Sequence, residues 1–334
     1  MNKRKLGKTN LMVSEIGMGG IPIQRTTVEE VKKIIDELIA CNINFIDTAR
    51  GYTVSEEYLG EALKGKRDKF IIATKSMSRT YKDMKRDIEI SLKNLQTDYI
   101  DLYQMHNLKS KEEYDLVMSK DGALRALLEA KACGKIGDIG VTSHSLDFLE
   151  SIIDDMPFAT IQFPYNFIET KAENLFKKAK RLEIGVICMK PLAGGAIENS
   201  KVALKYILNS DAISVAIPGM GSVLEVKQNA SVKKEELSEA DIEYITNIRE
   251  TLDNDFCRRC GYCLPCTKGI DIPNCFVFEG YFERYGLAEW AKERYKGLAH
   301  KASECIECGV CKTRCPYTLD IPEKLKRVKR IFGE

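Results

Sequence analysis

The repeated alternation of short apolar runs with amphipathic segments is the feature that most limits the folds open to this chain. Eight runs have the character of buried strands: VSEIGMGG, NFIDTA, FIIATK, YIDLYQMH, IGDIGVT, TIQFPY, GVICMKP and VAIPG. Helical patterns lie between them, such as VEEVKKIIDELIACN, KDMKRDIEISLKNLQ and ALRALLEAKACGK. Eight strand–helix units over about 250 residues predict a (β/α)8 TIM barrel, in the α/β class.

A doubly wound parallel sheet is the alternative that this alternation leaves open. Such a sheet would carry a GxGxxG turn leading from the first strand into a helix. The nearest match, GMGGIP, places Pro22 where that helix should open. The barrel is therefore the favoured prediction.

Charge and hydropathy exclude several functional classes. The chain has 51 basic and 49 acidic residues, so a net charge of +2 provides no general field for nucleic acid or an anionic membrane. No run approaches the ~20 apolar residues of a membrane span. After the basic start, Ser14 and Glu15 interrupt the segment LMVSEIGMGG before an apolar core of signal-peptide length can form. We therefore expect a cytoplasmic protein whose twelve cysteines are metal ligands rather than disulfides.

The cysteines are distributed unevenly, and their distribution predicts two domains. Nine of the twelve follow residue 256. The segment 231–255 is charged and helical in period. We place the boundary at its end, which gives a barrel at 1–255 and a small, cysteine-rich, mainly helical domain at 256–334.

Polar residues stand at the ends of the predicted strands, where barrels collect their chemistry. Asp47 ends the second strand, Tyr52 follows in DTARGY, Lys75 ends the third strand and His106 the fourth. An ammonium at the end of a hydrophobic strand must be paired or hydrated. Asp47, on the neighbouring strand, is the expected partner of Lys75.

The remaining strand ends indicate a nucleotide site. Strands five and six end near Ser143, His144, Gln162 and Asn166. The turns PLAGG and IPGMGS, which follow strands seven and eight, are small and rich in glycine. Such turns let backbone N–H groups approach phosphate oxygens.

Taken together, these segments resemble the aldo-keto reductase family. The resemblance is carried by FIDTARGYTVSEEYLGEAL, FIIATKS, DLYQMH, IGVTSHS, IQFPYN, KPLAGG and PGMGS followed by QNA, in order over roughly residues 3 to 230. It implies a catalytic tetrad of Asp47, Tyr52, Lys75 and His106. It also implies an NAD(P)H-dependent enzyme that reduces the carbonyl group of a small molecule.

The chemistry of such a tetrad can be stated independently of the resemblance. Hydride addition to a carbonyl leaves negative charge on its oxygen, so the site needs a proton donor and an electrostatic stabiliser. An unperturbed tyrosine titrates at about 10, and a nearby ammonium lowers that value. We therefore expect Tyr52 to be the donor and Lys75 its activator. Asp47 would hold Lys75, and His106 would orient the substrate oxygen.

The resemblance also implies the residues that contact the coenzyme. Ser143, His144 and Gln162 would hold the nicotinamide carboxamide, and Met189 stands where many members place an aromatic ring against the nicotinamide. Glu225 lies where NADP-preferring members often carry an arginine. Its carboxylate predicts that NAD(H) is used at least as well as NADP(H). The full expected set is Ser143, His144, Gln162, Met189, Pro191, Leu192, Gly194, Gly219, Ser222, Glu225, Gln228 and Asn229.

The C-terminal cysteines follow an iron–sulfur pattern. The segment CIECGVCKTRCP has the C-x2-C-x2-C-x3-C-P spacing of bacterial ferredoxins. The segment CRRCGYCLPC lies upstream, with a final spacing one residue shorter. An internal repeat aligns the two motifs, because CTKGIDIP and CPYTLDIP both place Asp-Ile-Pro five residues after the fourth cysteine.

This alignment predicts two 4Fe-4S clusters whose ligands cross between the motifs. In two-cluster ferredoxins the fourth cysteine of each motif ligates the other cluster. The first set is Cys257, Cys260, Cys263 and Cys315, and the second is Cys305, Cys308, Cys311 and Cys266. Zinc is the alternative, but it needs only four ligands per site and leaves the regular third cysteine of each motif unexplained. Cys41, Cys133, Cys188 and Cys275 lie outside the pattern.

The sequence thus resembles an aldo-keto reductase fused to a ferredoxin domain, and two roles for the clusters remain open. They would either exchange electrons with a redox partner protein or serve only as structural or redox-sensing elements of a carbonyl reductase. A hydride carries two electrons and each cluster takes one, and the sequence shows no flavin signature to connect them. A nucleotide-sensing module without turnover is a third possibility, which the complete tetrad disfavours.

Overall fold

The computed structural model describes residues 1–252, 256–259, 261–315 and 317–334, and these form two compact units. The first unit contains Met1–Asn166, Thr170–Leu192 and Asn199–Glu236. The second contains Phe167–Glu169, Ala193–Glu198 and Leu237–Glu334. The second unit thus takes in the helix before the cysteines, and the domain boundary at residue 255 stays a prediction.

The first unit is a parallel barrel. Its strands are β3 (Met18–Gly19), β4 (Phe45–Asp47), β5 (Ile71–Ser76), β6 (Ile100–Met105), β7 (Ile136–Thr142), β8 (Thr160–Pro164), β9 (Gly185–Met189) and β10 (Val215–Ile217), paired in sequence order. Parallel bridges from Ile16 to Ala216 and from Gly19 to Gly219 join the first strand region to the last. This near-closure confirms the predicted TIM barrel and rules out the open doubly wound sheet. An antiparallel hairpin of β1 (Lys3–Lys5) and β2 (Met12–Ser14) precedes it.

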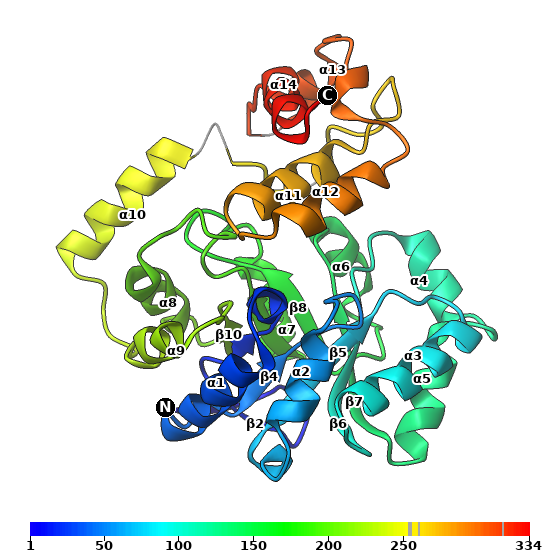
Figure 1. Cartoon of the computed structure of the whole chain (residues 1–334), viewed down its shortest axis with the longest axis vertical. Helices are drawn as coiled ribbons and strands as arrows, with labels where there is room; N and C mark the ends of the chain where they lie inside the picture. Colours follow the sequence, from blue (N-terminus) through cyan, green and yellow to red (C-terminus); the bar gives the residue numbers. More distant parts are fainter. Residues whose placement is uncertain (253–255, 260, 316) are drawn as a thin grey trace. The chain divides into compact units, whose positions relative to one another are not determined.

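Helices lie outside the strands of this unit (Figure 1). They are α1 (Val28–Ala40), α2 (Ser55–Ala62), α3 (Tyr81–Asn94), α4 (Lys111–Met118), α5 (Ala123–Ala132), α6 (Leu146–Ile152), α7 (Glu173–Arg181), α8 (Ser200–Leu208) and α9 (Val223–Ala230), with short 3-10 turns η1 (Ile21–Arg25) and η2 (Arg67–Lys69). Hydroxyl side chains cap several of them, as Thr80 does for α3 and Ser110 for α4. Two helices, α4 and α5, connect β6 to β7, whereas the sequence pattern indicated one.

Apolar faces of these helices pack against the outer side of the strands. In α1, Ile34, Ile35 and Leu38 are fully buried and belong to the same core cluster as Ile46 of β4 and Ile72 of β5. The helical period of these residues places them on one stripe, which explains why the segment forms a barrel helix. The strand ends, and therefore the predicted site residues, are fixed by this layer.

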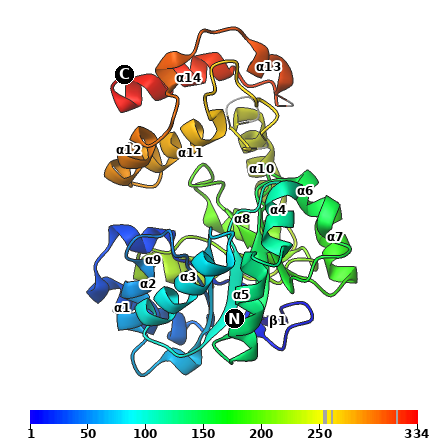
Figure 2. The same ribbon diagram turned by 90° about the vertical axis from the view of Figure 1, so that its right-hand side faces the viewer.

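The second unit is helical, as predicted. It contains α10 (Glu239–Leu252), α11 (Ile272–Glu283), α12 (Ala288–Lys296), η3 (Ala302–Glu304), α13 (Val310–Arg314) and α14 (Ile321–Phe332). Helix α11 packs against both α12 and α14 (Figure 2). The repeated Asp-Ile-Pro starts α11 and α14 in the same way: Asp271 and Asp320 cap them with φ −77° and ψ within 2° of each other. The sequence repeat is thus also a structural repeat.

No helix among the described residues is long and apolar enough to span a membrane.

Candidate active site and cysteine-lined cavities

The four predicted catalytic residues lie at neighbouring strand ends of the barrel. Asp47 is the last residue of β4, Lys75 the fifth of β5, and His106 directly follows β6. Tyr52 lies in the turn before α2 and is half-buried. Because parallel strands present their carboxyl ends at one edge, the alternation of β and α brings these residues together.

Asp47 and Lys75 form a buried ion pair. Lys75 is 1% exposed and Asp47 is 2% exposed. The Lys75 ammonium donates to Asp47 Oδ2, and to the carbonyl oxygen of Thr48 at 2.9 Å. Burial lowers the pKa of Lys75, and the carboxylate of Asp47 opposes that change. The sequence predicted that Lys75 would pair with Asp47, and the structure contains that ion pair.

Tyr52 lies beside this pair. The Lys75 ammonium is 4.8 Å from the centroid of the Tyr52 ring. The His106 ring lies 6.2 Å from the Tyr52 ring, centroid to centroid, and is nearly perpendicular to it at 87°. The structure therefore gathers all four predicted residues around one point at the barrel mouth.

Two glutamines complete the surroundings of Asp47. Its Oδ1 accepts from Gln162 Nε2 at 2.8 Å and from Gln104 Nε2 at 3.2 Å. Gln162 was predicted to bind the coenzyme, and here it also supports Asp47. Gln104 was missed by the sequence analysis. The sequence could have indicated Gln104, because side chains two residues apart on a strand share a face and Gln104 lies two residues before His106.

His106 is held in its neutral form. Burial, together with the charges of Lys75 and Arg79, lowers the pKa of His106 well below its ordinary value of 6.5. Among the described residues, His106 Nδ1 and Gln104 Oε1 are buried without a hydrogen-bond partner. Buried polar atoms are normally satisfied, so two orphaned ones beside the tetrad fit a place where a polar ligand binds.

The polar residues of the next two strand ends, among them those expected at the nicotinamide, lie after β7 and on or after β8. Ser143 is buried, its N–H donates to the Gln162 carbonyl at 3.1 Å, and its hydroxyl donates to the Leu108 carbonyl at 2.6 Å. His144 follows it and is half-buried. Asn166 is buried after β8 and donates to the Lys190 carbonyl at 3.1 Å.

The residues expected after β9 are divided between the two units. Met189 ends β9 and is half-buried, as is Leu192, and Pro191 is buried. Gly194 belongs to the second unit, where Arg284 Nε donates to its carbonyl oxygen at 3.2 Å. Its φ of +68° suits glycine.

In the last loop, Glu225 is occupied by the protein itself. Its Oε2 accepts from the Gly221 N–H at 2.6 Å and from the Ser222 hydroxyl at 3.3 Å, which closes the first turn of α9. Its Oε1 lies 4.0 Å from the Arg25 guanidinium. Lys227 points elsewhere, with its ammonium 3.7 Å from Glu37. Arg25, at the end of η1, was missed by the sequence analysis.

The other residues expected in this loop differ in accessibility. Gly219 is exposed, and a Cβ there would lie 2.8 Å from Pro22 Cγ, so only glycine fits this approach. Gln228 is exposed, whereas Asn229 is 3% exposed.

A buried carboxylate beneath the Tyr52 turn was also missed. Glu56 is 1% exposed and accepts from Arg50 at 2.7 Å, Thr74 at 2.7 Å and Ser91 at 2.8 Å. The Arg50 N–H in turn donates to the Lys75 carbonyl at 3.0 Å. This network fixes the start of α2 against β5.

Two cavities in the second unit are lined by cysteines. The first encloses about 360 Å³, partly open to solvent, and is lined by Cys263, Cys266, Cys305, Cys308 and Cys311. The second encloses about 310 Å³ and is lined by Cys257, Cys263 and Cys315. Cys260, which was predicted to join the second set, lies outside the described residues.

Contacts beside the cavities also run between the motifs. Thr267 Oγ1, next to Cys266, lies 3.5 Å from Cys308 Sγ. The Arg258 guanidinium, next to Cys257, lies 4.1 Å from the centroid of the Tyr317 ring. Within the described part of the chain, no three His, Cys, Asp or Glu side chains are close enough to hold a metal ion.

The cysteines outside the pattern are separate from these cavities. Cys275 is fully buried in α11, and burial raises the pKa of its thiol to about 12. Cys188 is buried in β9 and donates to the Tyr165 carbonyl at 3.1 Å. Cys41 is half-buried, and Cys133 is exposed.

Comparison with known proteins identifies two families. Residues 15–202 match the model of the aldo/keto reductase family, and residues 256–320 match a 4Fe-4S dicluster domain. L-galactose dehydrogenase of Arabidopsis thaliana is 28% identical over 304 residues, which cover 75% of this chain and 94% of that protein. Aldo-keto reductase YhdN of Bacillus subtilis is 31% identical over 63% of this chain and 68% of its own length.

A solved structure shows the same relationship. Aldo-keto reductase AKR11C1 from Bacillus halodurans, in its holo form, superimposes with a TM-score of 0.65 at 26% identity. The match covers 74% of this chain and 96% of that one.

Proposed function

The chain belongs to the aldo/keto reductase family and carries a 4Fe-4S dicluster domain, and from this premise we propose that it reduces an aldehyde or ketone with NAD(P)H. The observation that carries the proposal is the buried Lys75–Asp47 pair beside Tyr52. The coenzyme, when bound, supplies the hydride that adds to the carbonyl carbon. The side chains then have to stabilise and protonate the oxygen.

Tyr52 is the proton donor in this proposal. An ammonium 4.8 Å from the Tyr52 ring stabilises the phenolate that remains after the phenol gives up its proton. Asp47 keeps Lys75 charged despite its burial, because loss of that partner would leave an unpaired cation in the protein interior. The two glutamines on Asp47 Oδ1 keep the carboxylate in place.

His106 orients the substrate oxygen. A neutral imidazole donates one hydrogen bond, and it does so without competing with Tyr52 as an acid. The cations of Lys75 and Arg79 and the burial of the ring all favour that neutral form. The buried, unpartnered Nδ1 supports a role for the ring in binding a polar ligand.

The coenzyme would be held along the adjacent strand ends. Ser143, His144 and Gln162 would bind the carboxamide, with Met189 against the nicotinamide ring. The turn at Pro191 and Leu192, and the turn at Gly219 and Ser222, would hold the phosphates, while Gln228 and Asn229 would face the adenosine. The orphaned polar atoms beside the tetrad fit such a ligand.

We infer that NAD(H) serves at least as well as NADP(H). A 2′-phosphate near the start of α9 would meet the Glu225 carboxylate and the Arg25 guanidinium together. Both side chains are more than a third exposed, so their charges are screened and each is worth about 1 kcal/mol or less. The repulsive and attractive contributions then nearly cancel, and the extra phosphate gains little.

The cysteine cavities support two clusters with crossed ligands. One cavity is lined by Cys266, Cys305, Cys308 and Cys311, the other by Cys257 and Cys315, and Cys263 lines both. Together with Cys260 these are the two predicted sets of four. Thiolates are the ligands that such clusters need, and each cluster would carry one electron at a time.

We propose that the clusters exchange electrons with a redox partner protein. The test is anaerobic absorption spectroscopy of the purified chain, titrated separately with NADH, NADPH and a reduced one-electron carrier such as a ferredoxin. Bleaching of the clusters by the carrier supports electron exchange. If no reagent reduces the clusters and the chain still reduces carbonyl compounds, the clusters are structural. That result would refute the proposed electron exchange.

The carbonyl reductase activity is tested by isotope transfer. The parent chain is incubated with a panel of aldehydes and ketones and with NADH or NADPH deuterated at C4. Mass spectrometry should find one deuterium on the carbon of the alcohol product. Coenzyme oxidation without label in any alcohol would contradict the proposal.

A further inference from the structure

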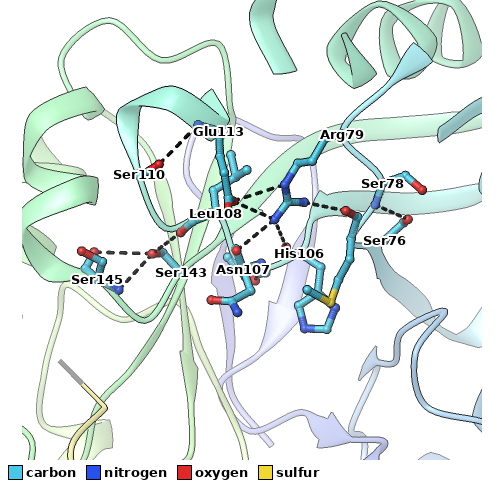
Figure 3. Close-up of polar contacts among 12 residues, drawn as sticks. Ser76, Ser78, Arg79, His106, Asn107, Leu108, Ser110, Glu113, Ser143 and Ser145 are labelled. Atoms are coloured by element: carbon cyan, nitrogen blue, oxygen red, sulfur yellow. Dashed lines mark hydrogen bonds and ion pairs between the residues drawn. The ribbon is translucent and has the colours of Figure 1, made fainter. Parts of the chain in front are cut away.

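Arg79 lies beside the tetrad and makes hydrogen bonds that the mechanism above, which uses only its charge, does not explain. It follows β5 and is 15% exposed. Its guanidinium donates to the carbonyl oxygens of His106, Asn107 and Met77, each at 3.0 Å. It also donates to Glu113 Oε2, from Nη2 at 3.1 Å and from Nε at 3.3 Å. Figure 3 shows the guanidinium between these oxygens.

The backbone that Arg79 holds has an unusual conformation. Asn107 has φ +54°, in the left-handed region that few residues other than glycine adopt. This turn directs the consecutive carbonyls of His106 and Asn107 toward the same guanidinium. Asparagine adopts this conformation more readily than most other residues with a side chain, and hydrogen bonds from the surroundings hold it in place here. Arg79 supplies two of the hydrogen bonds that do so.

Arg79 is itself presented from a fixed loop. The Ser76 and Ser78 hydroxyls donate to Asp87 Oδ2 at 2.5 and 2.7 Å, and the Ser78 N–H donates to Ser76 Oγ at 3.0 Å. On the other side, Glu113 lies in the first turn of α4, where Ser110 caps its N–H. The planar guanidinium thus joins the β5 loop, the β6 loop and α4.

The turn held by Arg79 also reaches the predicted nicotinamide site. The Ser143 hydroxyl donates to the Leu108 carbonyl at 2.6 Å, and the Asn107 N–H donates to the Thr142 hydroxyl at 2.7 Å. Arg79 holds one side of residues 106–108, and the end of β7 holds the other (Figure 3). Asn107, which directly follows His106, is bonded from both sides.

We propose that Arg79 is a positioning residue that fixes the His106 turn for catalysis, an inference that rests on the proposed carbonyl reductase function. It touches neither substrate nor coenzyme in this proposal. It acts by holding the backbone of His106 and by placing a fixed positive charge near the ring. Among the described residues, the charged and titratable groups beside His106 include Tyr52, Lys75 and Arg79, and each cation has a paired carboxylate, Asp47 for Lys75 and Glu113 for Arg79.

The test compares Arg79→Met with Arg79→Lys in the full chain. Arg79→Met removes both the donors and the charge, so kcat should fall by about 10- to 100-fold, the cost of a small misplacement near the chemistry. The dissociation constant of the coenzyme should change by less than about threefold. Arg79→Lys keeps the charge but not the planar fork, and should recover part of kcat.

Histidine NMR gives a readout that does not depend on activity. The chain has three histidines, and His106→Gln identifies the signal of His106 by its loss. Because Arg79 lowers the pKa of His106, the titration midpoint of that signal should rise in Arg79→Met and stay low in Arg79→Lys. The matched control is Arg125→Met, which breaks an exposed Arg–Glu pair of 3.1 Å on α5. It should change neither kcat nor the His106 midpoint.

The outcomes separate this proposal from the proposed function. If Arg79→Met resembles Arg125→Met in kcat and in the His106 midpoint, Arg79 has no positioning role. If kcat falls in Arg79→Met while the titration midpoint of His106 is unchanged, the proposal is also overturned, because the loss of activity would then not act through His106. If Arg79→Met does not fold, an Arg79→Lys variant with parental kcat and parental His106 line shape would overturn it. A parent chain without carbonyl turnover refutes the function, yet the midpoint still decides the role of Arg79.

Discussion

Replacement of Asp47 by asparagine should destabilise the barrel strongly, because it leaves the buried ammonium of Lys75 without its counter-charge. Both side chains are at most 3% exposed. Breaking such a pair by removing one partner costs about 3 to 5 kcal/mol. An asparagine would also have to present its NH2 group, which is a donor, either to the Lys75 ammonium or to the two glutamine amides that now donate to Oδ1.

Hydrogen exchange measured by mass spectrometry can report this loss in the intact chain. Peptides that cover β4 and β5 should lose protection by about two to four orders of magnitude, since ~1.4 kcal/mol is tenfold. The matched control is Asp138→Asn on β7, whose pair with Lys131 at 2.8 Å is partly exposed. That variant should cost about 1 kcal/mol or less.

The pH dependence of the Asp47→Asn variant has a definite sign. Burial lowers the pKa of Lys75 in the folded state, and without Asp47 nothing comparable opposes it. The unfolded chain then binds a proton that the folded chain does not, up to about pH 10.4, so stability rises with pH in that range. The penalty should therefore shrink between about pH 7 and pH 9.

A second substitution makes the reasoning refutable. Asp47→Asn combined with Lys75→Met removes the buried charge altogether and should restore most of the lost protection. If Asp47→Asn costs less than about 1 kcal/mol near neutral pH, the pair is not buried as described. If the double variant is no more protected than the single one, the unpaired ammonium is not the cause.

Two further predictions concern the clusters and the coenzyme. Anaerobically purified protein should contain about eight iron and eight sulfide per chain. The double variant Cys315→Ala/Cys257→Ala should lose about half of the iron, because both cysteines are assigned to one cluster. The double variant Cys315→Ala/Cys308→Ala should lose nearly all of the iron, because the two cysteines are assigned to different clusters. The opposite pattern in iron analysis would mean that ligation does not cross between the motifs. The parent should bind NADH at least as tightly as NADPH in fluorescence titrations; Glu225→Gln should favour NADPH by about fivefold, and Arg25→Ala should weaken NADPH selectively. A parent that prefers NADPH, or an Arg25→Ala variant with unchanged affinities, would contradict this assignment.

The barrel, and the meeting of Asp47, Lys75 and His106 at one of its edges, could be predicted because the signals are local and repeated. Eight apolar runs alternate with helical patterns, and the polar residue at the end of a run marks the catalytic edge of a barrel. Asp47, Lys75 and His106 were found in this way, and their strands bring them together. The repeated Asp-Ile-Pro aligned the two cysteine motifs in the sequence, and the structure gives both copies the same cap at the start of α11 and α14.

The supporting residues could not be predicted, because their roles depend on which segments meet in space. Arg79 is one of many basic residues in the sequence, and only the fold brings its guanidinium to the carbonyls of the β6 turn. The contacts of Glu225 with the Gly221 N–H and with Arg25 likewise depend on how the last loop folds, and its position in the sequence does not indicate them. Gly194 lies in the second unit, a placement that its position within PLAGG does not indicate.

The most direct test of the account is the rate of carbonyl reduction by Tyr52→Phe. This change removes the phenolic proton and keeps the ring, so turnover should fall by ~10² or more while the dissociation constant of the coenzyme stays nearly constant. The matched control is Tyr99→Phe, an exposed tyrosine just before β6, at the opposite end of that strand from His106. The account predicts full turnover for Tyr99→Phe and the large loss for Tyr52→Phe. Parental turnover in Tyr52→Phe would contradict it.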